Sequence, residues 1–232
     1  MSELTPVQLF YICLTVAIIL TRIPVLGVFF RSVNTLLHET GHALAALLLS
    51  GEVLSVSLNS DTSGSAHTRM TSKRGALLVS FAGYPFAAAG SATLVWMAVT
   101  GHIRIGLFAL LSLALSNLVL FVRNAYGITW LIIFSGIVVF LLKSDLQETN
   151  RTFFLVVSLI AFAETVISTL IIIWQGLMHP SKAGDITILA KQSRINASIW
   201  TILMALVCGY IIFETVARFF PPFSQLLTNP AV

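Results

Sequence analysis

Charged side chains are scarce in this sequence. Asp, Glu, Lys and Arg together make up 9% of the 232 residues, whereas 57% of the residues are hydrophobic. A soluble domain carries roughly 25% charged residues, because it must cover a surface that faces water. The scarcity of charge therefore excludes a soluble globular fold. It predicts an all-α polytopic membrane protein, in which apolar helices of about 20 residues span the bilayer.

Two further scarcities narrow the class of protein. The chain has only two cysteines, Cys13 and Cys208, and both lie in apolar stretches, so neither a disulfide framework nor a cysteine-based metal site is indicated. The first five residues contain no Lys or Arg, which argues against a cleaved signal peptide.

The net charge is +4, but the basic residues are scattered singly between apolar runs. This pattern is typical of membrane-flanking charges and argues against a nucleic-acid partner.

The long apolar runs predict about six to seven transmembrane helices within a single domain, residues 1–232. Arg22 and Pro24 lie inside the first run, so a kink is expected there. The candidate spans are residues 7–29, 33–50, 75–99, 104–122, 126–142, 152–175 and 196–219.

Basic residues in the predicted loops indicate the orientation of the chain. We assume that the amino terminus and residues 51–74 share a side of the membrane. Five Lys and Arg residues then lie in loops on the opposite side, and seven lie on the shared side: Arg69, Lys73, Arg74, Arg123, Lys182, Lys191 and Arg194. Because cytoplasmic loops carry an excess of basic residues, this weak bias favours a cytoplasmic position for residues 51–74.

Residues 51–74 are the one stretch with a strand pattern. Leu54, Val56 and Leu58 alternate with serines, and a turn-rich run follows at residues 59–64. Residues 65–70 can then return as a second strand. This pattern predicts a β-hairpin at the membrane surface, with an irregular polar loop as the alternative.

Residues 38–43 read His-Glu-Thr-Gly-His-Ala, which is an HExxH sequence inside the second apolar run. On a helix, positions i and i+4 lie on one face about one turn apart, so the imidazoles of His38 and His42 can reach one tetrahedral metal ion. Glu39 is then placed to take a proton from metal-bound water. The motif predicts a zinc site with His38 and His42 as ligands and Glu39 as the catalytic base.

Chance seldom produces such a motif. With 5 His and 6 Glu in 232 residues, random placement yields it with a probability of roughly 0.3%. Ionisable side chains within a span are also costly unless they pair or bind something, so they indicate a functional site. A polar cluster that hydrogen-bonds between helices is the alternative, but such a cluster does not need this spacing.

The order of these features resembles a known family. The HExxH helix, the hairpin after it and a helix of small residues with Phe-Ala-Gly-Tyr-Pro at 81–85 are similar to the site-2 protease family of intramembrane zinc metallopeptidases, in its compact bacterial branch without a PDZ domain. The resemblance implies one zinc ion per chain, proteolysis of membrane-embedded substrates, and a hairpin that presents the substrate in extended form. It also implies a location in the bacterial inner membrane.

A third ligand for the metal is the open question. Many members of this family take it from an Asn-Pro…Asp-Gly motif, which this chain lacks, whereas the compact branch carries a Ser-Asp-Ala-like motif before its last span. Residues 184–186, Gly-Asp-Ile, resemble that motif, so Asp185 is the preferred ligand. The alternative role for Asp185 is a helix N-cap. Glu164, in the middle of an apolar run, is the second candidate ligand.

Other side chains and other functions are weaker candidates. Asp61 lies in the predicted turn, and His67, His102 and His179 fall in loops, where surface positions are expected.

The expected partners are a membrane protein or peptide substrate and the lipid bilayer. The alternative functions are a non-catalytic membrane metal-binding or scaffold protein and a small transporter. A transporter would predict paired broken helices in two similar halves, which the sequence does not show.

Overall fold

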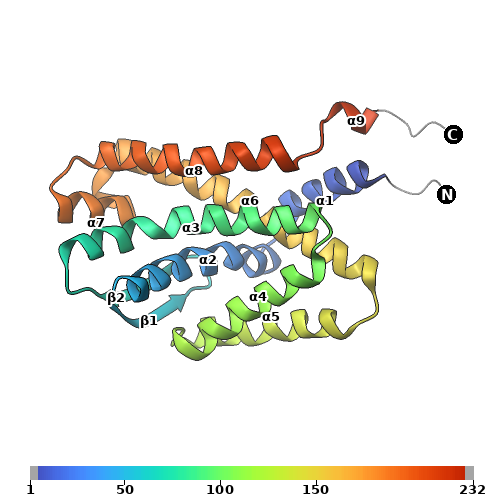
Figure 1. Ribbon diagram of the computed structural model, residues 1–232, viewed down its shortest axis with the longest axis horizontal. Coiled ribbons are helices and arrows are strands. Elements are labelled where there is room, and N and C mark those ends of the chain that lie inside the picture. Colours follow the sequence, from blue (N-terminus) through green and yellow to red (C-terminus); the bar gives the residue numbers. More distant parts are fainter. Residues whose placement is uncertain (1–4, 228–232) are drawn as a thin grey trace.

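The structure is a computed structural model, and it describes residues 5–227 as a bundle of helices with one small hairpin (Figure 1). Five helices, α3, α4, α5, α6 and α8, are long and apolar enough to cross a membrane. The prediction of an all-α polytopic membrane protein is therefore confirmed. The elements are α1 (Pro6–Leu20), α2 (Leu26–Leu48), β1 (Glu52–Leu58), β2 (Gly64–Arg69), α3 (Lys73–Val99), α4 (Ile103–Leu120), α5 (Ala125–Lys143), α6 (Gln147–Met178), the 3-10 turn η1 (Pro180–Lys182), α7 (Gly184–Ser193), α8 (Ala197–Phe219) and α9 (Ser224–Leu227).

The first two helices differ from the spans predicted at residues 7–29 and 33–50. Helix α1 ends at Leu20, and α2 begins at Leu26, seven residues before its predicted start. Pro24 has no backbone N–H and restricts the residue before it, and Val25 has a φ of 68°. These features interrupt the helix completely, where the sequence predicted only a kink.

Helices α1 and α2 follow one another from one end of the bundle to the hairpin, as a single interrupted crossing (Figure 1). The start of α1 therefore lies at the end of the bundle opposite the hairpin, and the assumption that the two share a side is wrong. The hydroxyl of Tyr11 donates a hydrogen bond of 2.6 Å to the carbonyl of Pro221, which joins α1 to the segment after α8 at that opposite end.

Helix α3 packs closely against α2 because small side chains face the contact. A Cβ atom on Gly41 of α2 would lie 2.6 Å from the Cβ of Phe86, and one on Gly83 of α3 would lie 2.5 Å from Nε2 of His42. Small residues allow membrane helices to approach in this way. The close approach brings the backbone of α3 up to the face of α2 that carries the two histidines.

The predicted hairpin is present, and one of its edges is covered. Strands β1 and β2 pair antiparallel, with Val56 opposite Ala66 and an irregularity between Val53 and Ser55. On its other edge, β1 pairs with the segment between α4 and α5. The N–H of Val56 donates to the carbonyl of Phe121 at 2.8 Å, and the N–H of Arg123 donates to the carbonyl of Val56 at 3.2 Å. The side-chain amide of Asn124 bonds both backbone groups of Leu58.

Because Val56 directs its backbone groups away from β2, the Val56–Ala66 pair is a non-hydrogen-bonded pair of the ladder. The backbone groups of Ala66 therefore point to the outer edge of β2. Because successive residues of a strand alternate, the backbone groups of Gly64 and Thr68 also point to the outer edge of β2. Within residues 5–227, no strand covers this outer edge.

Candidate metal centre

Helix α2 presents both histidines of the HExxH motif on one face. The Nε2 atoms of His38 and His42 are 3.1 Å apart. The Nδ1 atom of His42 lies 2.7 Å from the carbonyl oxygen of Val79 in α3, and as an N–H it donates a hydrogen bond to that oxygen. This bond holds the ring in place and leaves Nε2 with a lone pair directed at the site, as is usual for metal-binding histidines.

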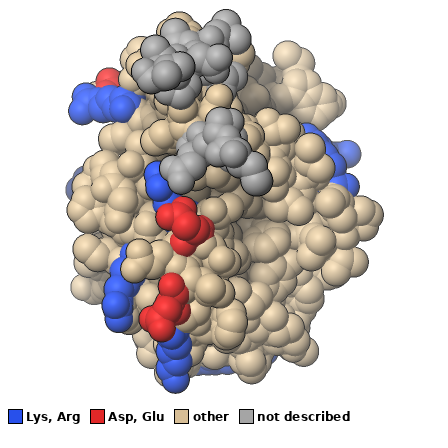
Figure 2. Space-filling view, turned by 90° about the vertical axis from the view of Figure 1, so that its right-hand side faces the viewer, with Lys and Arg blue, Asp and Glu red and all other residues tan. Residues whose placement is uncertain are grey.

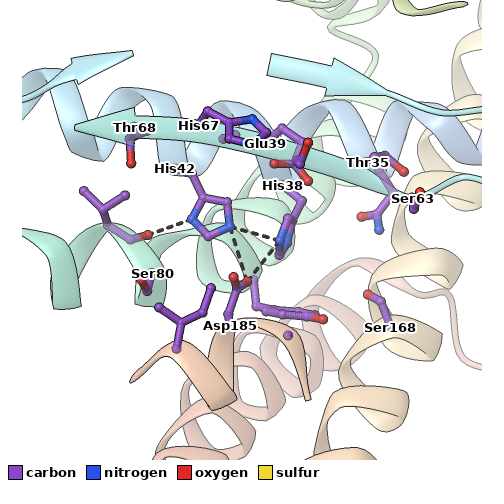
Figure 3. A pocket seen from close by; sticks show the side chains of 18 of the residues that line it. Thr35, His38, Glu39, His42, Ser63, His67, Thr68, Ser80, Ser168 and Asp185 are labelled. Carbon is purple, nitrogen blue, oxygen red and sulfur yellow. Dashed lines mark hydrogen bonds and ion pairs between the residues drawn. The ribbon is translucent and has the colours of Figure 1, made fainter. Parts of the chain in front are cut away.

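Asp185 reaches the histidines from a different part of the chain. Its Oδ2 atom lies 3.2 Å from the Nε2 of His38 and 3.3 Å from the Nε2 of His42 (Figure 3). Asp185 is the second residue of α7, and it makes no capping hydrogen bond, so the alternative role of N-cap is not what the structure shows. Ile186 and Leu189 of α7 are fully buried and anchor this short helix to the bundle.

The segment before α7 sets the direction of Asp185. Gly184 has a φ of 47°, a conformation that a glycine adopts without steric cost. The hydroxyl of Thr187 donates to the carbonyl of Pro180 at 2.7 Å and accepts from the N–H of Ala183 at 3.0 Å. The chain therefore turns sharply after α6 and begins α7 directly beside the histidines.

The three ligand atoms have the spacing that a metal ion requires. Zinc binds nitrogen and oxygen at about 2.0–2.1 Å, so two ligands of a tetrahedral site are about 3.3 Å apart. The distances of 3.1, 3.2 and 3.3 Å between the three atoms match this value. Burial raises the pKa of the Asp185 carboxyl, but the two imidazoles beside it outweigh burial and hold this pKa below its usual range. Asp185 is therefore ionised, as a metal ligand must be.

Glu39 lies beside this group and is held by the hairpin. Its side chain is 4% exposed. A Cβ atom on Gly64, the first residue of β2, would lie 2.5 Å from Oε1 of Glu39 and 2.7 Å from Cγ2 of Thr35. Only a glycine allows the strand to come this close to the carboxylate. The hydroxyl of Thr35 also donates to the carbonyl of Thr62 at 2.7 Å, which fixes the turn of the hairpin to α2.

A cavity of about 690 Å³ opens in front of these side chains. It is lined mainly by α2, by β2 and the turn before it, by α3 and by α7, and one residue each of β1 and α6 completes the lining (Figure 3). Every residue of β2 from Gly64 to Thr68 lines it, so the strand whose outer edge is uncovered borders the cavity. The candidate ligands and Glu39 therefore face a space that a peptide segment in extended form can enter.

Glu164, the second candidate ligand, lies outside this group. Its carboxylate is buried in α6 and forms an ion pair with Arg31, whose Nε atom lies 2.8 Å away. Arg31 lies inside α2, although the sequence placed it in a loop. The ion pair with Arg31 joins α6 to α2 and therefore accounts for the burial of Glu164.

Sequence reasoning missed several residues that line the cavity. His67 was expected at the surface. It is exposed, but it also borders the cavity (Figure 3). Asn34 lines the cavity as well, and its Oδ1 accepts a hydrogen bond of 2.8 Å from the hydroxyl of Thr165. The sequence could have indicated Asn34 as a residue of the site, because it lies four residues before His38 and therefore on the same face of the helix.

The fold and the site together define a class: an integral membrane protein with a candidate metal centre of the metallopeptidase type. Residues 11–215 match the model of the Peptidase M50B-like family, and the chain belongs to this family. The resemblance to the site-2 protease family is thereby confirmed. The comparisons with curated proteins and with solved structures gave no match.

Proposed function

We propose that this protein is an intramembrane zinc metalloprotease that hydrolyses peptide bonds of membrane-embedded or membrane-proximal substrates. The observation that carries the proposal is the convergence of His38, His42 and Asp185 on one point beside Glu39, in a cavity bordered by a free strand edge. We also propose the bacterial inner membrane as its location, with the hairpin on the cytoplasmic side. The seven basic residues counted for the hairpin side belong to β2, the start of α3, the α4–α5 connection and the region around α7, which lie at the hairpin end of the bundle (Figure 1) and support this orientation.

His38, His42 and Asp185 would hold the ion as two neutral imidazoles and one carboxylate, a set that zinc accepts in catalytic sites. Zinc bound there would act as a Lewis acid toward water and toward the carbonyl group of the scissile bond. The hydrogen bond from Nδ1 of His42 to Val79 keeps the ring fixed during the reaction.

Glu39 acts as the general base and then as the general acid. Its carboxylate accepts a proton from the attacking water as the new carbon–oxygen bond forms. It then delivers this proton to the leaving nitrogen as the carbon–nitrogen bond breaks, so that one acid and one amine are released. The contact with Gly64 holds the carboxylate at the wall of the cavity for both transfers.

The outer edge of β2 is the proposed position of the substrate. A helical substrate cannot be cut while its amides are bonded internally, but an extended segment can add to a free strand edge. The edge of β1 is already covered by residues 121–124, so the only free edge among residues 5–227 is that of β2. The backbone groups of Gly64, Ala66 and Thr68 would bond the substrate along the cavity.

The test is the substitution Glu39→Gln, measured as zinc content and as cleavage of a fluorescent single-span model substrate. Glutamine keeps the shape of the side chain but cannot accept the proton, so we expect one zinc per chain and a rate reduced roughly 10²–10⁴-fold. Glu52→Gln on the exposed part of β1 is the matched control and should cleave at the native rate. Equal turnover in both variants would refute the catalytic assignment and favour a non-catalytic metal-binding protein.

A further inference from the structure

A second cavity lies at the end of the bundle opposite the hairpin. Its volume is about 650 Å³, and it is formed where α3 and α5 end and where α4 and α6 begin. This size is within the range of pockets that bind small molecules. It shares no residue with the cavity of the candidate metal centre, so the proposed proteolysis does not account for it.

Four charged side chains line this second cavity, and their charges cancel. Arg104 and Arg151 are basic, and Asp145 and Glu148 are acidic. All four are exposed, and none of them forms an ion pair within residues 5–227, although other opposite charges of this chain, such as Arg218 and Glu214, do pair. Figure 2 faces this end of the molecule and shows acidic and basic side chains near one another on a largely uncharged surface.

The surroundings of the cavity are those of a membrane interface. Trp96, near the end of α3, is 39% exposed and stacks on His102, and exposed tryptophans are typical of the headgroup level. Large apolar side chains in the segments that form the cavity are also exposed, among them Ile105 of α4, Phe140 of α5 and Leu146 before α6. In a membrane protein such side chains face lipid chains.

We propose that this cavity binds the headgroup of a zwitterionic phospholipid with a primary ammonium group, such as phosphatidylethanolamine. The phosphate would lie against the guanidinium groups of Arg104 and Arg151, because guanidinium binds phosphate oxygens strongly. The ammonium would donate hydrogen bonds to the carboxylates of Asp145 and Glu148. The acyl chains would continue along the exposed apolar faces beside the cavity.

The charge balance of the cavity makes this headgroup the preferred one. An anionic phosphatidylglycerol brings a phosphate but no cation, so its negative charge would lie near the two carboxylates without a positive charge of its own to offset the repulsion. A phosphatidylcholine brings a cation, but its quaternary ammonium has no N–H to donate. The expected order of affinity is therefore phosphatidylethanolamine, then phosphatidylcholine, then phosphatidylglycerol.

The experiment is native mass spectrometry of the full chain in detergent, titrated with these three lipids at identical acyl chains. We expect one tightly retained phosphatidylethanolamine per chain. Arg104→Gln should weaken its binding about tenfold, as expected for the loss of one charge-assisted hydrogen bond. Glu148→Gln should weaken it as well, and it should strengthen the binding of phosphatidylglycerol, because the cavity then carries a net positive charge.

Two controls complete the test. Arg218→Gln removes one positive charge at the same end of the bundle but outside the cavity, and it should leave the binding of all three lipids unchanged. Glycerophosphoethanolamine, which has the headgroup but no acyl chains, should bind at least tenfold more weakly than the lipid. The proposal is overturned if the three lipids bind equally, if Glu148→Gln leaves their order unchanged, or if the chain-free headgroup binds as tightly as the lipid.

Discussion

Gly83→Ala tests whether the candidate metal centre depends on the close approach of α3 to α2. Gly83 faces the two histidines, and a Cβ atom placed on it would lie 2.5 Å from Nε2 of His42 and 2.7 Å from Cε1 of His38. Nonbonded heavy atoms are in optimal contact at about 3.5–4.0 Å, so the imidazoles or the helix must move by about 1 Å. The added methyl group therefore acts directly on the proposed ligand atoms.

The expected loss of zinc affinity follows from this displacement. A zinc site tolerates deviations of about 0.2 Å in its ligand distances, roughly a fifth of the required movement. Loss of a residue that only orients a ligand lowers metal affinity roughly 10–100-fold. Gly83→Ala displaces two ligands directly, so its loss of zinc affinity should reach at least the upper end of this 10–100-fold range. We therefore expect about 100-fold weaker zinc binding, equivalent to about 2.7 kcal/mol.

The assay is competition between the detergent-solubilised protein and a chelating zinc indicator. Gly90→Ala is the control, because Gly90 also lies in α3, but its added Cβ would meet only the flexible tip of Leu37, at 2.8 Å. Circular dichroism and thermal unfolding establish that both variants are folded. Native zinc affinity in a folded Gly83→Ala protein would refute the proposed position of the ion.

Three further predictions concern the ligand set, the base and the strand edge. Asp185→Ala should lower zinc affinity at least tenfold. Glu164→Gln should leave zinc affinity unchanged, but it should lower the free energy of unfolding by about 1–3 kcal/mol, because it breaks a partly buried ion pair. If a zinc titration gave the opposite ranking of the two variants, the third ligand would belong to α6. Gly64→Ala should displace the carboxylate of Glu39 and reduce kcat at least tenfold with zinc content unchanged, so native kcat would contradict the placement of the base. Ala66→Pro removes one outward amide donor of β2 and should reduce cleavage of the model substrate without loss of zinc, and an unaltered rate would exclude this edge as the substrate position.

Local sequence signals predicted the parts of the site that lie on one element. His38, Glu39 and His42 belong to one helical turn and a half, so their spacing alone indicates a shared face. The hairpin was predictable for the same reason, because the alternation of Leu54, Val56 and Leu58 is a property of one strand.

The remaining features depend on contacts between distant segments, for which a single sequence has no periodic signal. The approach of Asp185 to the histidines requires α7 to fold back after α6, and the pairing of Val56 with residues 121–123 joins segments about 65 residues apart. The interruption before α2 was underestimated, because Pro24 predicts a disturbed helix but not whether the helix resumes at once. Glu164 was a candidate ligand because of its position in the middle of an apolar run, and its actual partner, Arg31, lies about 130 residues away in the chain.

The free outer edge of β2 also defines a template for inhibitors. Outward backbone groups recur at Gly64, Ala66 and Thr68, and alternate residues of a strand are about 6.8 Å apart. A peptidomimetic with amide donors and acceptors at this repeat, and a zinc-binding group such as a hydroxamate at one position, would match both the strand and the metal centre. The covered edge of β1 gives such a compound no second place to bind on the hairpin, so its stoichiometry should be one per chain.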